Sequence, residues 1–114
     1  LAVFGGAFDL SDWDTMPKTI LDGFLWTTDS PDSAQARQKM GAATLADCIE
    51  QVDCPTLVVH GKRDAIFHYS QAVRIADALG QQAELLIEEN GVHCCHNYGF
   101  QYRTLMADWM AKTL

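Results

Sequence analysis

Apolar positions along the chain fall into short runs of strand length, separated by stretches with helical spacing. The strand candidates are Leu1–Phe4, Thr56–His60 and Ala83–Glu89. The second run is β-branched and almost wholly apolar, which is typical of a parallel strand covered on both faces. Glycines end the first two runs, at Gly5 and Gly61, as expected for strands that lead into tight turns.

Between these runs, hydrophobic residues recur at intervals of three and four. Pro17 suits the first position of a helix, which a loop at Thr27–Asp32 would end. Further helices are predicted at Ser33–Met40, at a stretch with Leu45, Ile49 and Val52 on one face, at Tyr69–Leu79, and at an amphipathic terminus that carries Tyr102, Leu105, Met106, Trp109 and Met110. Residues 14–52 are therefore expected to be helical.

Strands that alternate with helices predict an α/β fold, with a doubly wound parallel sheet of about three strands and flanking helices. A length of 114 residues suits one small domain, residues 1–114. The chain opens directly on the apolar run Leu1–Phe4, and a buried strand needs neighbours on both sides. We therefore expect the sheet to be incomplete by itself.

In open sheets of this kind, the functional residues lie in loops at the carboxyl ends of the strands. One loop reads Gly61-Lys62-Arg63-Asp64, and the loop after the last strand carries His93. If the strands are parallel neighbours, Asp64 and His93 emerge at the same edge. A carboxylate there could accept the Nδ1 proton of the imidazole, which leaves Nε2 free to take a proton from a nucleophile or from water.

These segments resemble a known family. The run Cys54–Asp64 resembles the strand and acid loop of α/β-hydrolases, and Gly91-Val92-His93 resembles the loop that bears their histidine. The runs His93–Asn97 and Met106–Trp109 are similar to the subfamily of dihydropseudooxynicotine hydrolase and of fungal hydrolases that shorten polyketides. Leu1–Trp13 resembles the strand and loop just after the helix of the nucleophile.

The resemblance implies the C-terminal part of an α/β-hydrolase catalytic domain, in which Asp64 is the acid and His93 the base of a Ser-His-Asp triad. It also implies a small-molecule carbonyl substrate, cleaved at an ester or at a carbon–carbon bond beside a ketone. No metal or organic cofactor is implied, and a homodimer is a candidate assembly. Residues 14–52 would lie next to the cap that many such enzymes carry.

This sequence departs from the family pattern because it lacks the motif that carries the nucleophile. In this fold the nucleophile occupies a Gly-x-Ser-x-Gly elbow, and none of the serines has flanking glycines: Ser11, Ser30, Ser33 and Ser70. We therefore expect the nucleophile outside this sequence, on the N-terminal part of the same hydrolase, and we expect this chain alone to be inactive. The alternative is a non-catalytic half-domain that completes or binds another chain.

Other histidines compete for a role. His96 lies three residues after His93 and is an alternative base. His60 ends an apolar strand and is interpreted as a core histidine with satisfied hydrogen bonds, whereas His68 is expected in a solvated loop.

The run His93-Cys94-Cys95-His96 raises a zinc hypothesis. Structural zinc sites space their cysteines by two to four residues. Adjacent thiols should point in different directions, so small packing residues are the favoured interpretation, ahead of zinc ligands or a catalytic cysteine. The residues Trp13, Phe24, Leu25 and Trp26 could line a substrate pocket, although ordinary core packing is favoured.

Charge excludes some partners. The net charge is −7, with 8 Lys and Arg against 15 Asp and Glu, so neither nucleic acid nor an anionic membrane is an expected partner. No apolar run approaches the roughly 18 residues of a membrane span, and no basic segment typical of a signal peptide opens the chain. The four cysteines do not form a disulfide-framework pattern, which favours reduced thiols and a cytoplasmic setting.

Overall fold

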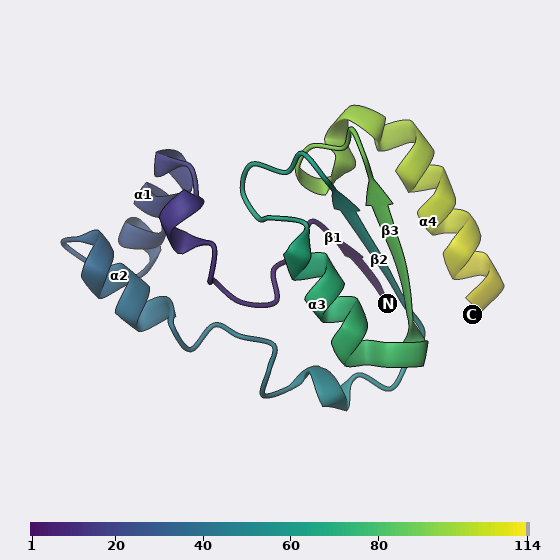
Figure 1. The fold of residues 1–114 in the computed structure, drawn as a ribbon, viewed down its shortest axis with the longest axis horizontal. Coiled ribbons are helices and arrows are strands. Elements are labelled where there is room, and N and C mark those ends of the chain that lie inside the picture. Colours follow the sequence, from purple (N-terminus) through teal and green to yellow (C-terminus); the bar gives the residue numbers. More distant parts are fainter. Residues whose placement is uncertain (114) are drawn as a thin grey trace.

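A computed structural model describes residues 1–113 and shows three parallel strands with helices on both faces (Figure 1). The strands are β1 (Ala2–Phe4), β2 (Thr56–Gly61) and β3 (Ala83–Glu88), in the order β1-β2-β3. The predicted α/β class, the parallel sheet and the three strand positions are confirmed.

The central strand β2 is buried along its whole length, because it has a neighbour on each edge and a helix on each face. Val59 pairs with Phe4 of β1, and Gly61 pairs with Glu88 of β3. The last residues of β2 and β3 therefore lie side by side. The loops that follow these two strands begin at the same edge of the sheet, as the sequence pattern predicts.

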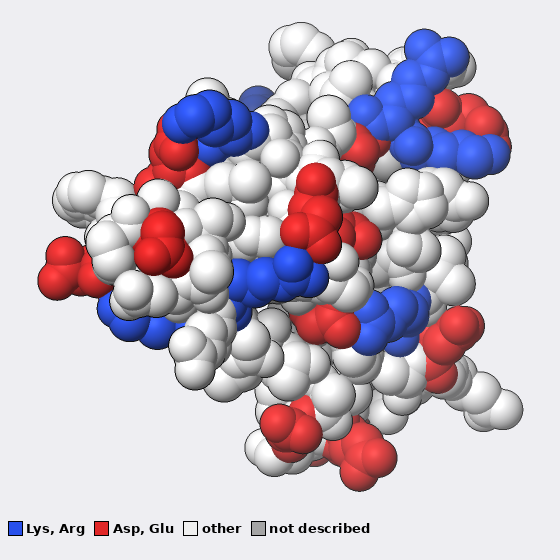
Figure 2. All heavy atoms as spheres, turned by 60° about the vertical axis from the view of Figure 1, so that its left-hand side comes forward, with Lys and Arg blue, Asp and Glu red and all other residues white. Residues whose placement is uncertain are grey.

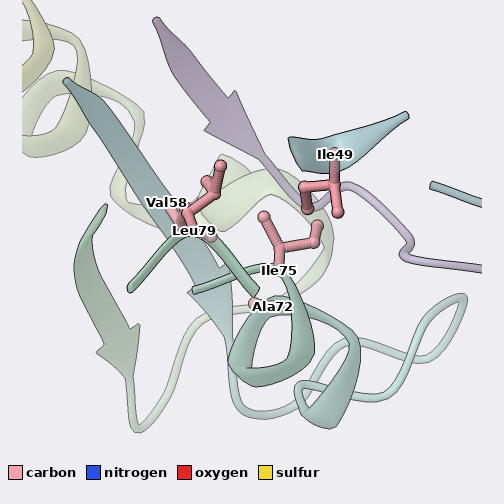
Figure 3. Close-up of a cluster of buried hydrophobic side chains, with 5 residues drawn as sticks. All are labelled: Ile49, Val58, Ala72, Ile75 and Leu79. Atoms are coloured by element: carbon pink, nitrogen blue, oxygen red, sulfur yellow. The ribbon is translucent and has the colours of Figure 1, made fainter. Parts of the chain in front are cut away.

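Helix α3 (Ser70–Leu79) covers one face of the sheet. Its apolar residues recur at helical spacing, and they pack against Val58 of β2 together with Ile49 from the preceding loop (Figure 3). The helix ends at Gly80, whose φ of 58° is readily adopted only by glycine. The buried residues of this cluster are Ile49, Val58, Ala72, Ile75 and Leu79.

Helix α4 (Gly99–Thr113) covers the opposite face. Alternation along β2 directs Leu57 and Val59 to this side, where they pack with Cys95 and Tyr102. The Tyr102 hydroxyl donates a hydrogen bond to Glu88 (2.8 Å). Burial, together with this carboxylate, raises the pKa of the tyrosine. The two helical layers make the sheet doubly wound.

Helices α1 (Lys18–Thr27) and α2 (Ser33–Met40) lie together to one side of the sheet (Figure 1). Trp13, in a short 3-10 turn, is buried and stacks on Phe24 with ring centroids 5.3 Å apart. Its indole N–H donates to the Ser33 hydroxyl (3.1 Å). Trp13 and Phe24 thus serve as packing residues of this helical pair, whereas Trp26 is 86% exposed.

The helix predicted over Leu45, Ile49 and Val52 is wrong. The structure has turns there and a single 3-10 turn at Ile49–Gln51. All three side chains still pack against the α3-side core, so their spacing reflects a shared packing face rather than an α-helix. The Thr44 hydroxyl accepts from Ala46 N–H (3.1 Å), a local side-chain bond that competes with helix formation.

The loop after β1 is attached to α3 by a polar network. Gln71 is 1% exposed, and its Oε1 accepts hydrogen bonds from the N–H groups of Phe8 (2.8 Å) and Asp9 (3.1 Å). The Arg74 guanidinium donates to both carboxylate oxygens of Asp9 (2.9 and 2.6 Å). Because of this charge-assisted pair, the pKa of the Asp9 carboxyl lies well below its usual value.

The basic side chains on the face shown in Figure 2 lie beside acidic ones. The ion pairs include Lys18 with Asp22 (2.6 Å) and Arg37 with Asp14 (2.8 Å). None of the helices within residues 1–113 combines the length and the hydropathy that a transmembrane span requires.

Candidate active site

The loop after β2 folds around the Asp64 carboxylate. Asp64 Oδ1 accepts hydrogen bonds from the N–H groups of Ile66 (2.8 Å) and Phe67 (3.1 Å), a turn geometry that short acidic side chains favour. The Asp64 side chain is 0% exposed. A buried carboxylate requires donors to offset its lost hydration, and the loop supplies two of them to this one oxygen.

The second oxygen of Asp64 faces the loop after β3 that carries His93, here called the histidine loop. His93 Nδ1 lies 2.9 Å from Asp64 Oδ2. Because a carboxylate oxygen can only accept, Nδ1 carries the hydrogen and donates it, and in this tautomer Nε2 carries the free lone pair. The His93 side chain is 32% exposed, so the imidazole is accessible while its partner is buried. The structure thus brings together the two residues that the sequence paired.

The two loops meet backbone to backbone at Gly61 and Gly91. A Cβ on Gly61 would lie 2.3 Å from the carbonyl oxygens of both Gly91 and Val92, and one on Gly91 would lie 2.8 Å from the Gly61 Cα. Arg63 N–H donates to the Gly91 carbonyl (2.9 Å). This close approach holds His93 against the acid loop, and only residues without a side chain permit it.

Substitution of Gly61 by alanine is therefore expected to separate the two loops. The new methyl group would displace backbone atoms rather than a flexible side chain, so we expect the free energy of unfolding to fall by about 1–3 kcal/mol. Urea unfolding measures this change. Gly23→Ala is the matched control, since nothing lies within 4 Å of its Cβ position in α1, and it should raise stability by about 0.5–1 kcal/mol. Equal stability of the two variants would contradict the close approach.

The two adjacent cysteines point in different directions. The Cys94 thiol donates to the Phe4 carbonyl (3.4 Å), whereas Cys95 is buried among Leu57, Val59 and Tyr102. Burial raises the pKa of both thiols, that of Cys95 to about 11, which disfavours the reactive thiolate. Both residues have φ near +50°, a conformation uncommon outside glycine. Within residues 1–113, no group of three or more His, Cys, Asp or Glu side chains is arranged to hold a metal ion.

The other histidines occupy three different environments. His96, the alternative base, is exposed, and its ring centroid lies 6.3 Å from that of His93. It is therefore near the site, but the histidine of this loop that contacts the Asp64 carboxylate is His93. His68 is exposed, as predicted, and its Nδ1 lies 2.8 Å from the Ser70 hydroxyl.

His60 is buried, as predicted, but it is not an ordinary core residue. Its Nε2 lies 3.0 Å from the Phe67 carbonyl and 3.2 Å from Asp64 Oδ2. Its Nδ1 is buried and has no hydrogen-bond partner among the described residues. The interpretation as a fully satisfied histidine is thus wrong for one ring nitrogen. The signal in the sequence was the position of His60, at a strand end and four residues before Asp64.

An open depression of about 480 Å³ lies beside the acid loop. It is lined by Asp12, Thr15, Asp64, Ala65, Ile66 and His68. A second depression, of about 200 Å³, is lined by residues of β1, of the loop after β3 and of α4, among them Phe4, Cys94, His96 and Met106. Both have the size of small-molecule sites, or of parts of them. The Asp12 carboxylate also accepts from His68 N–H (2.9 Å), so the loops after β1 and β2 meet at the first depression.

Comparison with known proteins places this arrangement in a family. The profile of the prolyl oligopeptidase family (Peptidase_S9) matches residues 5–114. The 2,6-dihydropseudooxynicotine hydrolase of Paenarthrobacter nicotinovorans is 30% identical over 112 residues, which are 97% of this chain and 30% of that protein. This chain therefore spans about a third of the length of that relative.

Solved structures agree with the fold. The crystal structure of a 2,6-dihydroxy-pseudo-oxynicotine hydrolase matches with a TM-score of 0.91 at 30% identity, covering 99% of this chain and 32% of that one. A meta-cleavage product hydrolase from Pseudomonas fluorescens IP01 matches with a TM-score of 0.59 at 15% identity, covering 99% of this chain and 56% of that one; this likeness concerns the fold alone. The resemblance to α/β-hydrolases is confirmed. The chain belongs to the prolyl oligopeptidase family, whose members are hydrolases of the α/β-hydrolase type.

Proposed function

We propose that this chain supplies the acid, Asp64, and the general base, His93, of a Ser-His-Asp triad. The observation that carries the proposal is the 2.9 Å contact between Asp64 Oδ2 and His93 Nδ1, made by a buried carboxylate and an accessible imidazole. The contact lies at the carboxyl ends of adjacent parallel strands, where open α/β sheets place their functional residues. Membership of a hydrolase family supports the same interpretation.

In the proposed reaction, a serine outside residues 1–114 attacks a carbonyl carbon. His93 Nε2 takes the hydroxyl proton as the bond forms, and the imidazolium then gives this proton to the leaving group. Asp64 stabilises the imidazolium and holds Nδ1–H toward itself, so that Nε2 faces the nucleophile. Backbone N–H groups of the elbow and of an earlier loop would bind the oxyanion; these groups also belong to the part that carries the serine.

The proposed substrate is a small molecule with a carbonyl group, cleaved at an ester or at a carbon–carbon bond beside a ketone. Resemblance to the 2,6-dihydropseudooxynicotine hydrolase supports this class. The depression of about 480 Å³ that Asp64 borders is a candidate part of the substrate site. Helices α1 and α2, which lie to one side of the sheet (Figure 1), are proposed to adjoin a cap.

The proposed partner is the N-terminal part of the same hydrolase, which would carry the nucleophile and would complete the active site. A homodimer is the proposed assembly, by resemblance alone. The proposed setting is cytoplasmic, in keeping with four cysteines that are all free thiols.

A serine-directed fluorophosphonate probe tests the proposal on the complete gene product that contains this chain. We expect labelling of a single serine located outside residues 1–114, because only a serine activated by a base reacts rapidly with such a probe. Peptide mapping by mass spectrometry locates the label. Labelling of a serine within this chain, or no labelling in a folded protein, would contradict the proposal, and the second result would favour a non-catalytic half-domain.

A further inference from the structure

His60 lies beside the carboxylate of the proposed triad. Its side chain and that of Asp64 are both 0% exposed. Nε2 lies 3.0 Å from the Phe67 carbonyl oxygen and 3.2 Å from Asp64 Oδ2. Two ring nitrogens, from His60 and from His93, thus contact the same carboxylate oxygen.

The surroundings determine which nitrogen of His60 carries the hydrogen. The Phe67 carbonyl and the Asp64 carboxylate both only accept, so Nε2 bears the hydrogen, donates it to Phe67 and presents positive charge density to Asp64. Nδ1 is then a buried acceptor without a partner among the described residues. Burying an unpartnered polar atom is unfavourable, and an apolar residue would fill the same space without that penalty. Core packing alone therefore does not account for a histidine here.

Phe67 connects His60 to both members of the proposed triad. Its N–H donates to Asp64 Oδ1 (3.1 Å), while its carbonyl accepts from His60 Nε2 (3.0 Å). Its ring lies 6.3 Å from the His93 ring, at 55° to it. His60 therefore ties the far end of the acid loop back to the end of β2, with the carboxylate enclosed between them.

We propose that His60 is a positioning residue for the triad, an inference that rests on the proposed function. It anchors the acid loop through the Phe67 carbonyl, and its N–H faces Asp64 Oδ2 so that this oxygen stays directed at His93 Nδ1. Without it, the loop that carries Asp64 loses its attachment to β2. The carboxylate then spends less time in the orientation that holds the His93 tautomer, which slows the chemical step rather than substrate binding.

The test measures fluorophosphonate labelling of the complete gene product at a series of probe concentrations. Two quantities are obtained: the maximal labelling rate and the probe concentration that gives half of this rate. For His60→Leu we expect the maximal rate to fall about 10- to 100-fold, with the half-saturating concentration within about threefold of the unsubstituted enzyme. For His60→Gln we expect most of the rate to return, to within about fivefold, because the amide Nε2 of glutamine can reach the Phe67 carbonyl and donate to it.

Val58→Ala is the matched control, since Val58 is buried on the same strand and the same face of the sheet. It should lower the free energy of unfolding, measured in urea, while the labelling rate stays within about threefold. A His60→Leu enzyme that labels as fast as the unsubstituted one would overturn the proposal, as would a His60→Gln enzyme no faster than His60→Leu. His93→Ala separates the proposed triad from the proposed role of His60. If the His93→Ala enzyme labels at the normal rate, the proposed function fails. If His93→Ala abolishes labelling but His60→Leu leaves it unchanged, only the role of His60 is overturned.

Discussion

Replacement of His93 by alanine is expected to lower kcat/KM of the complete hydrolase by at least about 10⁴-fold. Of the two histidines that contact the Asp64 carboxylate, His93 has a side chain that is 32% exposed, whereas the His60 side chain is fully buried. In the proposed mechanism, removal of His93 deprives the serine of its base and the leaving group of its acid. Hydrolysis of a p-nitrophenyl ester, together with the rate of fluorophosphonate labelling, measures the loss.

The matched control for this prediction is His96→Ala. His96 lies three residues further along the same loop and is exposed, so its removal leaves the Asp64–His93 contact unchanged. We expect its kcat/KM to stay within about fivefold of the unsubstituted enzyme, as for a surface substitution. A large loss for His96→Ala, combined with near-normal activity of His93→Ala, would move the base to His96.

Substitution of Asp64 by asparagine is expected to lower kcat/KM by about 10⁴-fold, for a reason that the geometry makes specific. The N–H groups of Ile66 and Phe67 both donate to Oδ1, so the amide oxygen of the asparagine must occupy that position. The amide NH₂ then takes the place of Oδ2. It faces His93 Nδ1 and His60 Nε2 as a donor. His93 is driven to the tautomer with the hydrogen on Nε2, which cannot accept the serine proton.

The pH profile and a charge-matched control complete this test. Because the Nε2–H tautomer must lose its hydrogen before it acts as a base, the Asp64→Asn enzyme should regain rate only at alkaline pH, through hydroxide. Asp22→Asn removes an equal charge from an exposed pair with Lys18 and should leave kcat/KM within about twofold, since exposed ion pairs contribute little. A loss of tenfold or less for Asp64→Asn would reduce Asp64 to a loop residue.

The local pattern was enough to predict most of the elements. The β-branched run at Thr56–His60 forms the buried central strand. The spacing of Val73, Ala76 and Leu79 predicted a helix over Tyr69–Leu79, although the residues of α3 that are buried against the sheet are Ala72, Ile75 and Leu79. Asp64 and His93 were paired from their places after neighbouring strands, and the structure brings them into contact. Their catalytic roles remain predictions, which the two variants above test.

Other features depended on contacts that no local pattern records. Leu45, Ile49 and Val52 share a packing face, but the backbone there forms turns, because long-range packing and a side-chain bond from Thr44 outweigh helical periodicity. The positive φ angles of Cys94 and Cys95 could not be predicted from the sequence pattern either. They occur where the backbone of Cys94 lies against Gly5 and its thiol reaches the Phe4 carbonyl at the end of β1.

The sequence by itself determined the α/β class, the order of strands and helices, and a carboxylate and an imidazole at one edge of the sheet. These features follow from apolar periodicity and from residues at strand ends, which act over a few positions. Only the tertiary structure decided that His93, rather than His96, contacts Asp64 and that His60 lies against the same oxygen. Those contacts depend on the register of β2 with β3 and on the approach of Gly61 to Gly91, both of which join segments distant in the chain.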